Sequence, residues 1–219
     1  MKLGIAIPCF IKHIPNLWIL LEALNNQTRL PDKVVVSCSS TEFIQIPSIY
    51  KFQLIICITP DYKNASQNRN IAISLLSDMD YISFIDADDI PHYQRNEIIL
   101  QTIANNNSDI ILHNFMIENV NLHNQITSVN FKHNVLCRAS SGCIMQINYE
   151  DECKFKIHHA QSTVRREICD KVLYDESAQY TGKEDCVFCY SVFSLPNIKN
   201  SYIYNELSYY VSSGSNVCQ

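Results

Sequence analysis

Glycine is scarce in this chain: its 219 residues include four, and none belongs to a Gly-x-Gly-x-x-Gly or Gly-Lys-Ser/Thr loop. Dehydrogenases and P-loop enzymes use such loops because their backbone must approach a phosphate closely. No serine–histidine–acid set occurs in a nucleophile-elbow context either. These absences remove the main support for a dehydrogenase or a P-loop enzyme.

Charge and long apolar runs are also sparse. Charged residues make up 18% of the chain, the net charge is −5 and no Lys/Arg cluster stands out, which argues against a nucleic-acid partner. No apolar run approaches the length of a transmembrane helix, and Pro8, Lys12 and His13 interrupt the first one too early for a signal peptide. We therefore expect a cytoplasmic globular protein without a transmembrane segment; peripheral membrane contact stays open.

Cysteine, by contrast, is plentiful, with ten residues. Because no export route is evident, we interpret these cysteines as reduced thiols, most of which fill the core. Cys186 and Cys189 form one close pair, but no second pair stands at zinc-site spacing. We assign this pair to packing and not to a metal.

The order of the apolar segments predicts an α/β fold with a mostly parallel central sheet and flanking helices. Strand-like runs occupy residues 2–8, 33–39, 52–59, 81–86 and 109–115. Helical patterns occupy residues 14–27, 65–77 and 92–107. The helix at 65–77 carries Ile71, Leu75 and Leu76, which we expect on its apolar face.

After about Asn119 the pattern changes to short alternating stretches, which are followed by a helix at 184–194 and a last strand at 201–211. No linker and no internal repeat separates the two parts. We therefore expect one domain over residues 1–219, made of two halves, 1–116 and 117–219.

Three aspartates, Asp86, Asp88 and Asp89, directly follow the apolar run at 81–85. Ligands of an open parallel sheet bind beyond the carboxyl ends of its strands. Strand periodicity predicts that Asp86 and Asp88 face one point while Asp89 turns away. Two converging carboxylates favour Mg²⁺ or Mn²⁺, although capping of the next helix is an alternative. We predict a cation site at Asp86 and Asp88, and a capping role for Asp89.

Five segments, taken in order, resemble a family 2 glycosyltransferase with the GT-A fold. They are "IAIPCF", "LLEALNNQTRLPDKVVVS", "ASQNRNIAI", "YISFIDADD" and "GKEDCVFC". The resemblance spans nearly the whole chain and is looser between about 117 and 157. It implies a GT-A-like, Rossmann-like fold with a nucleotide-sugar-binding half at 1–116 and a smaller, mixed acceptor-binding half at 117–219.

The same resemblance implies an activity. A family 2 enzyme transfers a sugar from a nucleotide-diphosphate donor to an acceptor hydroxyl, usually with inversion. For this chain a UDP-sugar is the favoured donor, and the acceptor is a saccharide, a lipid-linked glycan or a protein. Two alternatives stay open: a sugar nucleotidyltransferase, which normally opens with a glycine-rich loop that "IPCFIKHIPN" lacks, and a non-catalytic module that binds a sugar nucleotide or glycan.

The resemblance also implies which residues of this chain would contact the nucleotide-sugar donor. Asp88 would bind the Mn²⁺ or Mg²⁺ ion that bridges the two phosphates, with Asp86 near the ribose and the metal. Pro8 would lie beside the nucleobase, and Arg69 would point towards the base or the diphosphate.

The chain departs from the family pattern after the second strand. The family often has an Asp-Gly-Ser-like turn there to hold a pyrimidine, and this chain has "SCSST". Ser39, or alternatively Ser37 or Ser40, would then contact the base. Guanosine and thymidine donors therefore stay open.

The catalytic base is expected in "TGKED", where the family has a Glu-Asp pair at the acceptor entrance. Asp185 would accept the hydroxyl proton, and Glu184 is the fallback. Thr181 and Glu184 also have the spacing of a capping box, which would give Glu184 a structural role.

Two further pairs precede this segment. His158 and His159 are candidates for contact with the donor sugar, the acceptor or the metal, against a packing or surface role. Arg165 and Arg166 are candidates for phosphate contact; the alternative is pairing with the acids at 167 and 170.

Overall fold

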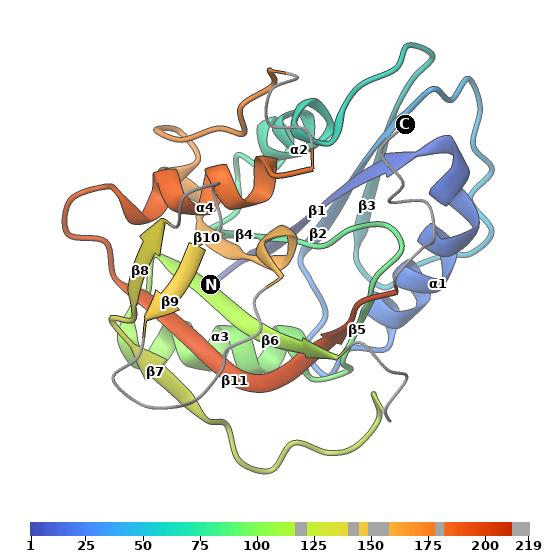
Figure 1. Ribbon diagram of the computed structural model, residues 1–219. Helices are drawn as coiled ribbons and strands as arrows, with labels where there is room; N and C mark the ends of the chain where they lie inside the picture. The colour runs from blue at the N-terminus through green and yellow to red at the C-terminus, as the bar shows by residue number, and fades with distance from the viewer. Residues whose placement is uncertain (117–121, 140–144, 149–157, 178–181, 212–219) are drawn as a thin grey trace.

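The computed structural model describes residues 1–116, 122–139, 145–148, 158–177 and 182–211. In this part of the chain a nine-stranded sheet lies between helices (Figure 1). Its strand order is β3-β2-β1-β4-β10-β6-β11-β5, and β7 pairs with β11. Strands β1, β2, β3, β4, β6 and β11 run in one direction, and β5, β7 and β10 run against them. The predicted mostly parallel α/β sheet is confirmed.

All predicted elements of the first half are present, with ends shifted by a few residues. The strands are β1 (Leu3–Phe10), β2 (Lys33–Ser39), β3 (Gln53–Thr59), β4 (Tyr81–Phe84) and β6 (Ile110–Met116), with a short β5 (Ile90–Pro91) that the sequence did not predict. The helices are α1 (Ile14–Asn25), α2 (Ala65–Ser74) and α3 (Arg95–Asn106).

Three strands of the second half, β7, β10 and β11, belong to the same sheet. The elements of this half are β7 (Phe131–His133), β10 (Thr163–Arg165), α4 (Glu184–Phe193) and β11 (Asn200–Tyr209), and a separate pair of strands, β8 (Leu136–Ala139) and β9 (Met145–Asn148). Strand β10 lies between β4 and β6 and is antiparallel to both. Strands from both halves therefore alternate across the sheet.

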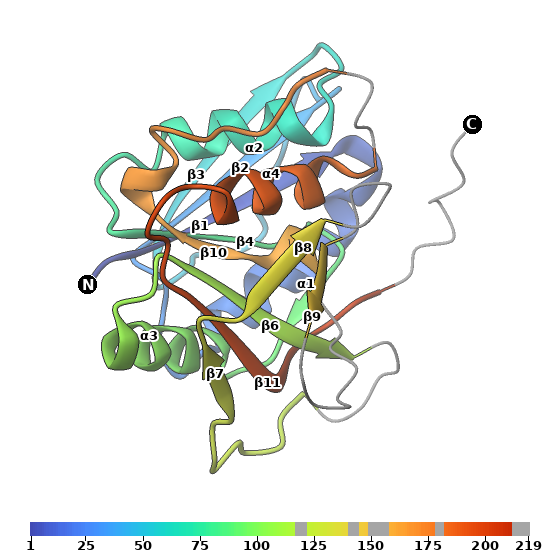
Figure 2. The same ribbon diagram turned by 60° about the vertical axis from the view of Figure 1, so that its left-hand side comes forward.

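Both faces of the sheet are covered, which explains why its central strands are apolar throughout. On β1, Leu3, Ile5 and Ile7 pack in the core beneath α1 and α3, whereas Ala6 faces the core beneath α2 and α4. Figures 1 and 2 show these helix pairs on opposite sides of the sheet. No helix among the described residues is both long and apolar enough to cross a bilayer.

The predicted apolar face of α2 is wrong in part. Leu76 is buried as expected, but Ile71 is half-buried and Leu75 is exposed. The helix instead buries Ala72 and Ile73, together with the polar residues Ser66, Asn68 and Arg69. Asn68 bonds to Ser37 and Ser39 at the end of β2, and Arg69 bonds to Asp86 after β4, so these two side chains point towards the carboxyl end of the sheet.

Gly4 sets the distance between β1 and the chain that follows α2. A methyl group at this position would lie 2.7 Å from Leu76 Cδ2 and 2.8 Å from Met79 Cγ, which is closer than packed atoms tolerate. We expect Gly4→Ala to lower the free energy of unfolding by about 1–2 kcal/mol through overpacking, as measured by urea denaturation. The control Asn105→Ala changes an exposed position of α3 and should stay within about 0.5 kcal/mol of wild type. Equal stability of the two variants would contradict this packing argument.

Candidate functional site

A cavity of about 560 Å³ opens at the carboxyl ends of β1 and β4. Its wall combines the end of β1, the start of α2, the turn after β4 that carries the aspartates (residues 86–89, the aspartate turn), and the start of α4. The predicted residues on this wall are Pro8, Arg69, Asp86, Asp88, Glu184 and Asp185. The fold thus brings six predicted site residues together from segments up to 177 positions apart in sequence (185 − 8).

Arg69 joins the two sides of this cavity. Its Nη2 donates to Asp86 Oδ1 at 2.7 Å, and its Nη1 donates to Glu184 Oε1 at 2.8 Å. The side chain is 2% exposed. Burial opposes the charge of the guanidinium, but the two carboxylates outweigh it and raise the pKa of Arg69 well above its ordinary value. Arg69 therefore remains a cation that ties the aspartate turn to α4.

Neighbouring groups hold Arg69 in place. Its guanidinium lies 5.1 Å from the centre of the Tyr174 ring, and Tyr174 stacks on Phe188 of α4 with ring centres 4.1 Å apart. The side chain of Asn70 makes two hydrogen bonds with the backbone of Tyr174, at 2.9 and 3.0 Å. The arginine is thus fixed by packing as well as by charge.

The capping role predicted for Asp89 is wrong. Helix α3 begins at Arg95, and no side chain caps it in the described structure. Strand β4 ends at Phe84, so the two-residue periodicity assumed for Asp86 does not extend into the following turn. There the backbone amide of Asp89 donates to the carbonyl of Asp86 at 3.1 Å. The turn places the Asp89 carboxylate beside that of Asp86.

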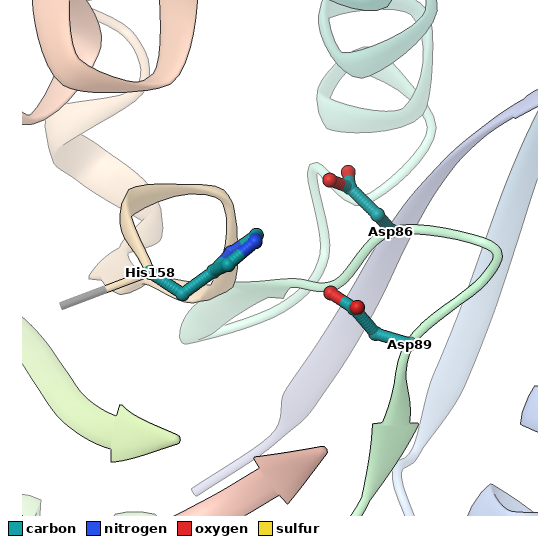
Figure 3. A group of neighbouring side chains, drawn as sticks. All are labelled: Asp86, Asp89 and His158. Atoms are coloured by element: carbon teal, nitrogen blue, oxygen red, sulfur yellow. The ribbon is translucent and has the colours of Figure 1, made fainter. Parts of the chain in front are cut away.

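Asp86, Asp89 and His158 form a compact group. One ligand atom from each lies within 4.8 Å of the other two. Figure 3 shows the His158 ring reaching from its turn towards the two carboxylates. Among the described residues, Asp89 Oδ1 and His158 Nδ1 are buried and have no hydrogen-bond partner. Asp88 lies on the same cavity wall but outside this trio.

The electrostatics of the trio are unusual. Burial, together with the charges of Asp86 and Asp88, raises the pKa of Asp89 to about 8. Burial lowers the pKa of His158, although the nearby carboxylates act in the opposite direction. Asp89 therefore holds its proton at neutral pH. A divalent cation would displace that proton and find carboxylate oxygens and a neutral imidazole as ligands, a donor set suited to such an ion.

Gln161 and Arg95 hold this group in position. Gln161 Nε2 donates to Asp89 Oδ2 at 2.6 Å, and Gln161 Oε1 accepts a hydrogen bond from the Ser208 hydroxyl. Arg95 is fully buried, and its Nη2 donates to the carbonyls of Phe84 and Gln161 at 3.2 and 3.1 Å. The same guanidinium therefore fixes both the end of β4 and the short 3-10 helix (His159–Gln161) next to His158.

The predicted capping box at the start of α4 is wrong for Glu184. The helix begins at Glu184 itself, with Lys183 before it, so Glu184 is not three positions inside the helix. Its carboxylate pairs with Arg69 instead. Thr181 lies outside the described residues. Asp185 is half-buried on the cavity wall, and its Oδ1 accepts a hydrogen bond from the backbone amide of Cys186 at 2.8 Å.

Comparison with known proteins identifies the family of the chain. The sequence profile described as Glycosyl transferase family 2 matches residues 4–173, which include β1, the aspartate turn and His158. The chain belongs to this family. Comparison with curated proteins gives no match.

Solved structures show the same fold. TarS of S. aureus, residues 1–349 with UDP, has a TM-score of 0.65 and 17% identity over 97% of this chain and 61% of that one. The complex of the same fragment with UDP-GlcNAc gives a TM-score of 0.67 and 16% identity over 97% and 59%. A structure of TarS gives a TM-score of 0.68 at 17% identity over 97% of this chain and 37% of that one. The family 2 chain thus spans about three-fifths of the two TarS fragments and less of the longer chain.

In this family 2 chain the two serines at the end of β2, Ser37 and Ser39, bond to residues inside the protein. Ser39 is fully buried; its hydroxyl donates to the carbonyl of Lys63 and accepts a hydrogen bond from Asn68 Nδ2, both at 3.2 Å. Ser37 donates to Asn68 Oδ1 at 2.9 Å. Lys63 and Asn68 line the cavity, and Ser39 does not appear on its wall. Contact between Ser39 and a nucleobase stays a prediction, which this burial does not favour.

Aromatic rings lie on two sides of the cavity, and the sequence prediction missed three of them, Phe10, Tyr62 and Tyr210, while it named His158 as a candidate. Phe10 lies next to Tyr62 with ring centres 6.1 Å apart, and His158 lies next to Tyr210 at 4.8 Å. All four residues line the cavity. Flat apolar rings at these positions suit a nucleobase or a sugar face. Phenylalanine and tyrosine are common in the sequence, so no local signal distinguishes Phe10, Tyr62 and Tyr210.

The remaining candidates lie elsewhere or are only partly described. Arg165 pairs with Asp109 at 2.7 Å and Arg166 pairs with Asp170, around a second cavity of about 610 Å³ at the amino end of β4. Arg166 thus has the predicted acidic alternative as its partner, and Arg165 has a different one. The backbone of His159 begins a 3-10 helix; its side chain lies outside the description.

Proposed function

We propose that this chain is a glycosyltransferase that moves a sugar from a nucleotide-diphosphate donor, with a UDP-sugar favoured, to a hydroxyl of a saccharide, lipid-linked or protein acceptor. The observation that carries the proposal is the single cavity where Pro8, Arg69, Asp86 and Asp88 meet the start of α4. Family membership supports the activity, and the UDP and UDP-GlcNAc complexes of TarS support the donor class.

A divalent cation, Mn²⁺ or Mg²⁺, fits this site. Two carboxylates and a neutral imidazole converge at Asp86, Asp89 and His158, and two of these groups present buried polar atoms without a partner among the described residues. These three residues would hold the cation, with Asp88 on the adjacent wall as the ligand expected from the family resemblance. When bound, the cation would stabilise the negative charge of the departing diphosphate.

Asp185 is the better candidate for the general base. Glu184 already accepts a hydrogen bond from the buried Arg69, so its carboxylate is engaged in the contact between α2 and α4. Asp185 has a bond from its neighbouring amide and otherwise faces the cavity. In the proposed reaction Asp185 takes the proton from the acceptor hydroxyl while that oxygen attacks the sugar opposite the diphosphate, which inverts the anomeric carbon.

We further propose that residues 1–219 act as one domain, with the donor bound by residues 1–116 and the acceptor by residues 117–219, in the cytoplasm. The alternation of strands from both halves within one sheet supports this division into cooperating halves and not into separate domains. Because the chain is shorter than the TarS structures, its acceptor is proposed only by class.

The proposal is tested by incubating the protein with a panel of UDP-sugars and Mn²⁺ and measuring the release of UDP. We expect slow donor hydrolysis even without acceptor, and its loss when a chelator removes the metal. Asp88→Ala should lower the rate by roughly 100-fold, because the diphosphate charge loses part of its stabilisation. The control Asp170→Asn, at an exposed position near the second cavity, should leave the rate unchanged.

Other outcomes would overturn the proposal. A rise in melting temperature with UDP-sugars but no UDP release with any donor or acceptor would indicate a non-catalytic binding module. Release of pyrophosphate from a nucleoside triphosphate and a sugar phosphate would indicate a nucleotidyltransferase.

A further inference from the structure

Two cysteines are direct neighbours at the carboxyl ends of adjacent strands. Cys9 on β1 pairs in register with Cys38 on β2, and the two strands are parallel. Residues in register on parallel strands point to the same face, and such strands lie about 4.8 Å apart. That spacing lies within the roughly 4.4–6.8 Å that a disulfide requires between Cα atoms. The backbone therefore already has the separation of a cysteine bridge.

The two thiols also interact. Their hydrogen bond raises the pKa of Cys9, and burial adds to this effect. The same bond lowers the pKa of Cys38 to about 7 against the effect of burial, with help from the Thr41 hydroxyl, whose oxygen lies 3.2 Å from Cys38 Sγ. When two cysteines share one proton in this way, the other sulfur is a thiolate, which is the reactive form of cysteine.

A small oxidant can reach this pair through the donor cavity. Cys9 lines the cavity wall between Pro8 and Phe10, whereas Cys38 is fully buried behind it. Both sulfurs belong to the core cluster that packs against α1. The cavity is therefore the route by which a water-sized reagent meets the pair, and a ligand that fills the cavity should cover it.

We propose that Cys9 and Cys38 form a redox-active dithiol that closes to a disulfide when a hydroperoxide enters the cavity. Cys9 lines the cavity, so its sulfur passes its proton to the Cys38 thiolate and attacks one peroxide oxygen; the O–O bond breaks, hydroxide leaves, and Cys9 becomes a sulfenic acid. The second sulfur then attacks the oxidised sulfur, the S–S bond forms and the S–O bond breaks. One hydrogen peroxide thus converts two thiols into one disulfide and two waters.

Closure would join the end of β1, which carries Pro8 and Phe10, to the end of β2, and so it would change the wall of the cavity. This effect on donor binding depends on the proposed function, but formation of the disulfide does not. A bridge of this kind is reversed by a thiol reductant.

Cys57 provides a matched control. It lies on β3, the other neighbour of β2, and is partly exposed. Its partner in register on β2 is Ser37, while Cys38 faces Ile58. Cys57 therefore points to the opposite face from Cys38 and has no thiol across the strand.

The test is to treat the wild-type protein with hydrogen peroxide, alkylate the remaining thiols under denaturing conditions and map the peptides by mass spectrometry. We expect a linked pair of peptides that contain Cys9 and Cys38, two hydrogens lighter than their sum, which dithiothreitol separates. Cys57→Ala should leave the link intact, and Cys9→Ala and Cys38→Ala should each abolish it. If peroxide oxidises Cys57 in the wild-type protein while Cys9 and Cys38 remain unlinked and are alkylated, the proposal is wrong. This result does not depend on whether the variants fold.

Ligand protection separates this proposal from the proposed function. With UDP and Mn²⁺ at ten times the Kd, linking should slow about tenfold, because the free cavity is about tenfold less populated. A disulfide that forms equally fast with and without bound UDP would support the dithiol and contradict the assignment of the cavity to the donor. Binding of UDP without any Cys9–Cys38 link would overturn the dithiol and leave the proposed function standing.

Discussion

Asp185→Asn is expected to lower the rate of sugar transfer by about 10²–10⁴-fold while leaving donor binding nearly unchanged. Asparagine keeps the shape of the side chain and its bond to the Cys186 amide, but it cannot take a proton from the acceptor hydroxyl. The measurement is kcat and KM for donor and acceptor by UDP release, together with the Kd for UDP by calorimetry. The effect should appear in kcat.

Glu184→Gln provides the comparison for this experiment. Because Glu184 pairs with buried Arg69, we expect its substitution to act mainly through stability. A Glu184→Gln variant that folds with native stability but loses transfer, alongside an active Asp185→Asn variant, would identify Glu184 as the base. Loss of UDP binding in Asp185→Asn would contradict a role confined to proton transfer.

Arg69→Met is expected to lower the free energy of unfolding by about 3 kcal/mol. Removing the guanidinium leaves the carboxylates of Asp86 and Glu184 without their shared cation, and breaking a buried ion pair typically costs about 3–5 kcal/mol. We take the lower end of that range because the Asp86 side chain is 28% exposed and keeps contact with water. Urea denaturation of wild type and variant measures the difference.

The matched control is Arg166→Met. Arg166 forms an ion pair with Asp170 four positions later, and the Asp170 side chain is 65% exposed. The Arg166 side chain itself is only 15% exposed, but water screens the charge of Asp170, so the pair should contribute at most about 1 kcal/mol. Arg69→Lys should recover part of the loss, since one ammonium group cannot reproduce the planar fork that bonds both carboxylates. Equal losses for Arg69→Met and Arg166→Met would mean that the buried network does not stabilise the fold.

The order of strands and helices followed from local sequence patterns. Continuous apolar runs predicted β1, β2 and β4 because both faces of the sheet are buried, and this property is visible residue by residue. The placement of the aspartates after β4 predicted their position at the cavity. Five short segments in order were enough to indicate the family, which the profile match to residues 4–173 confirms.

The finer errors came from assuming that a local pattern continues past the end of its element. Alternation along a strand turned Asp89 away from Asp86, but β4 stops at Phe84 and the following turn places these two carboxylates side by side. The metal role of Asp88 stays a prediction. Likewise, spacing alone suggested a capping box for Glu184, although its partner is Arg69 on another helix.

By itself the sequence determined the element order, the family and the segments that carry the site, because each depends on residues near one another along the chain. The tertiary structure alone decided which side chains meet. Arg69 and Glu184 are 115 positions apart, Gln161 and Asp89 are 72 apart, and Cys9 meets Cys38 because β1 and β2 are in register. Such contacts depend on how the sheet orders and aligns its strands. The short alternating stretches after Asn119 do not show that β10 lies between β4 and β6. Strand pairing depends on how the whole domain packs, and no short stretch of residues encodes it.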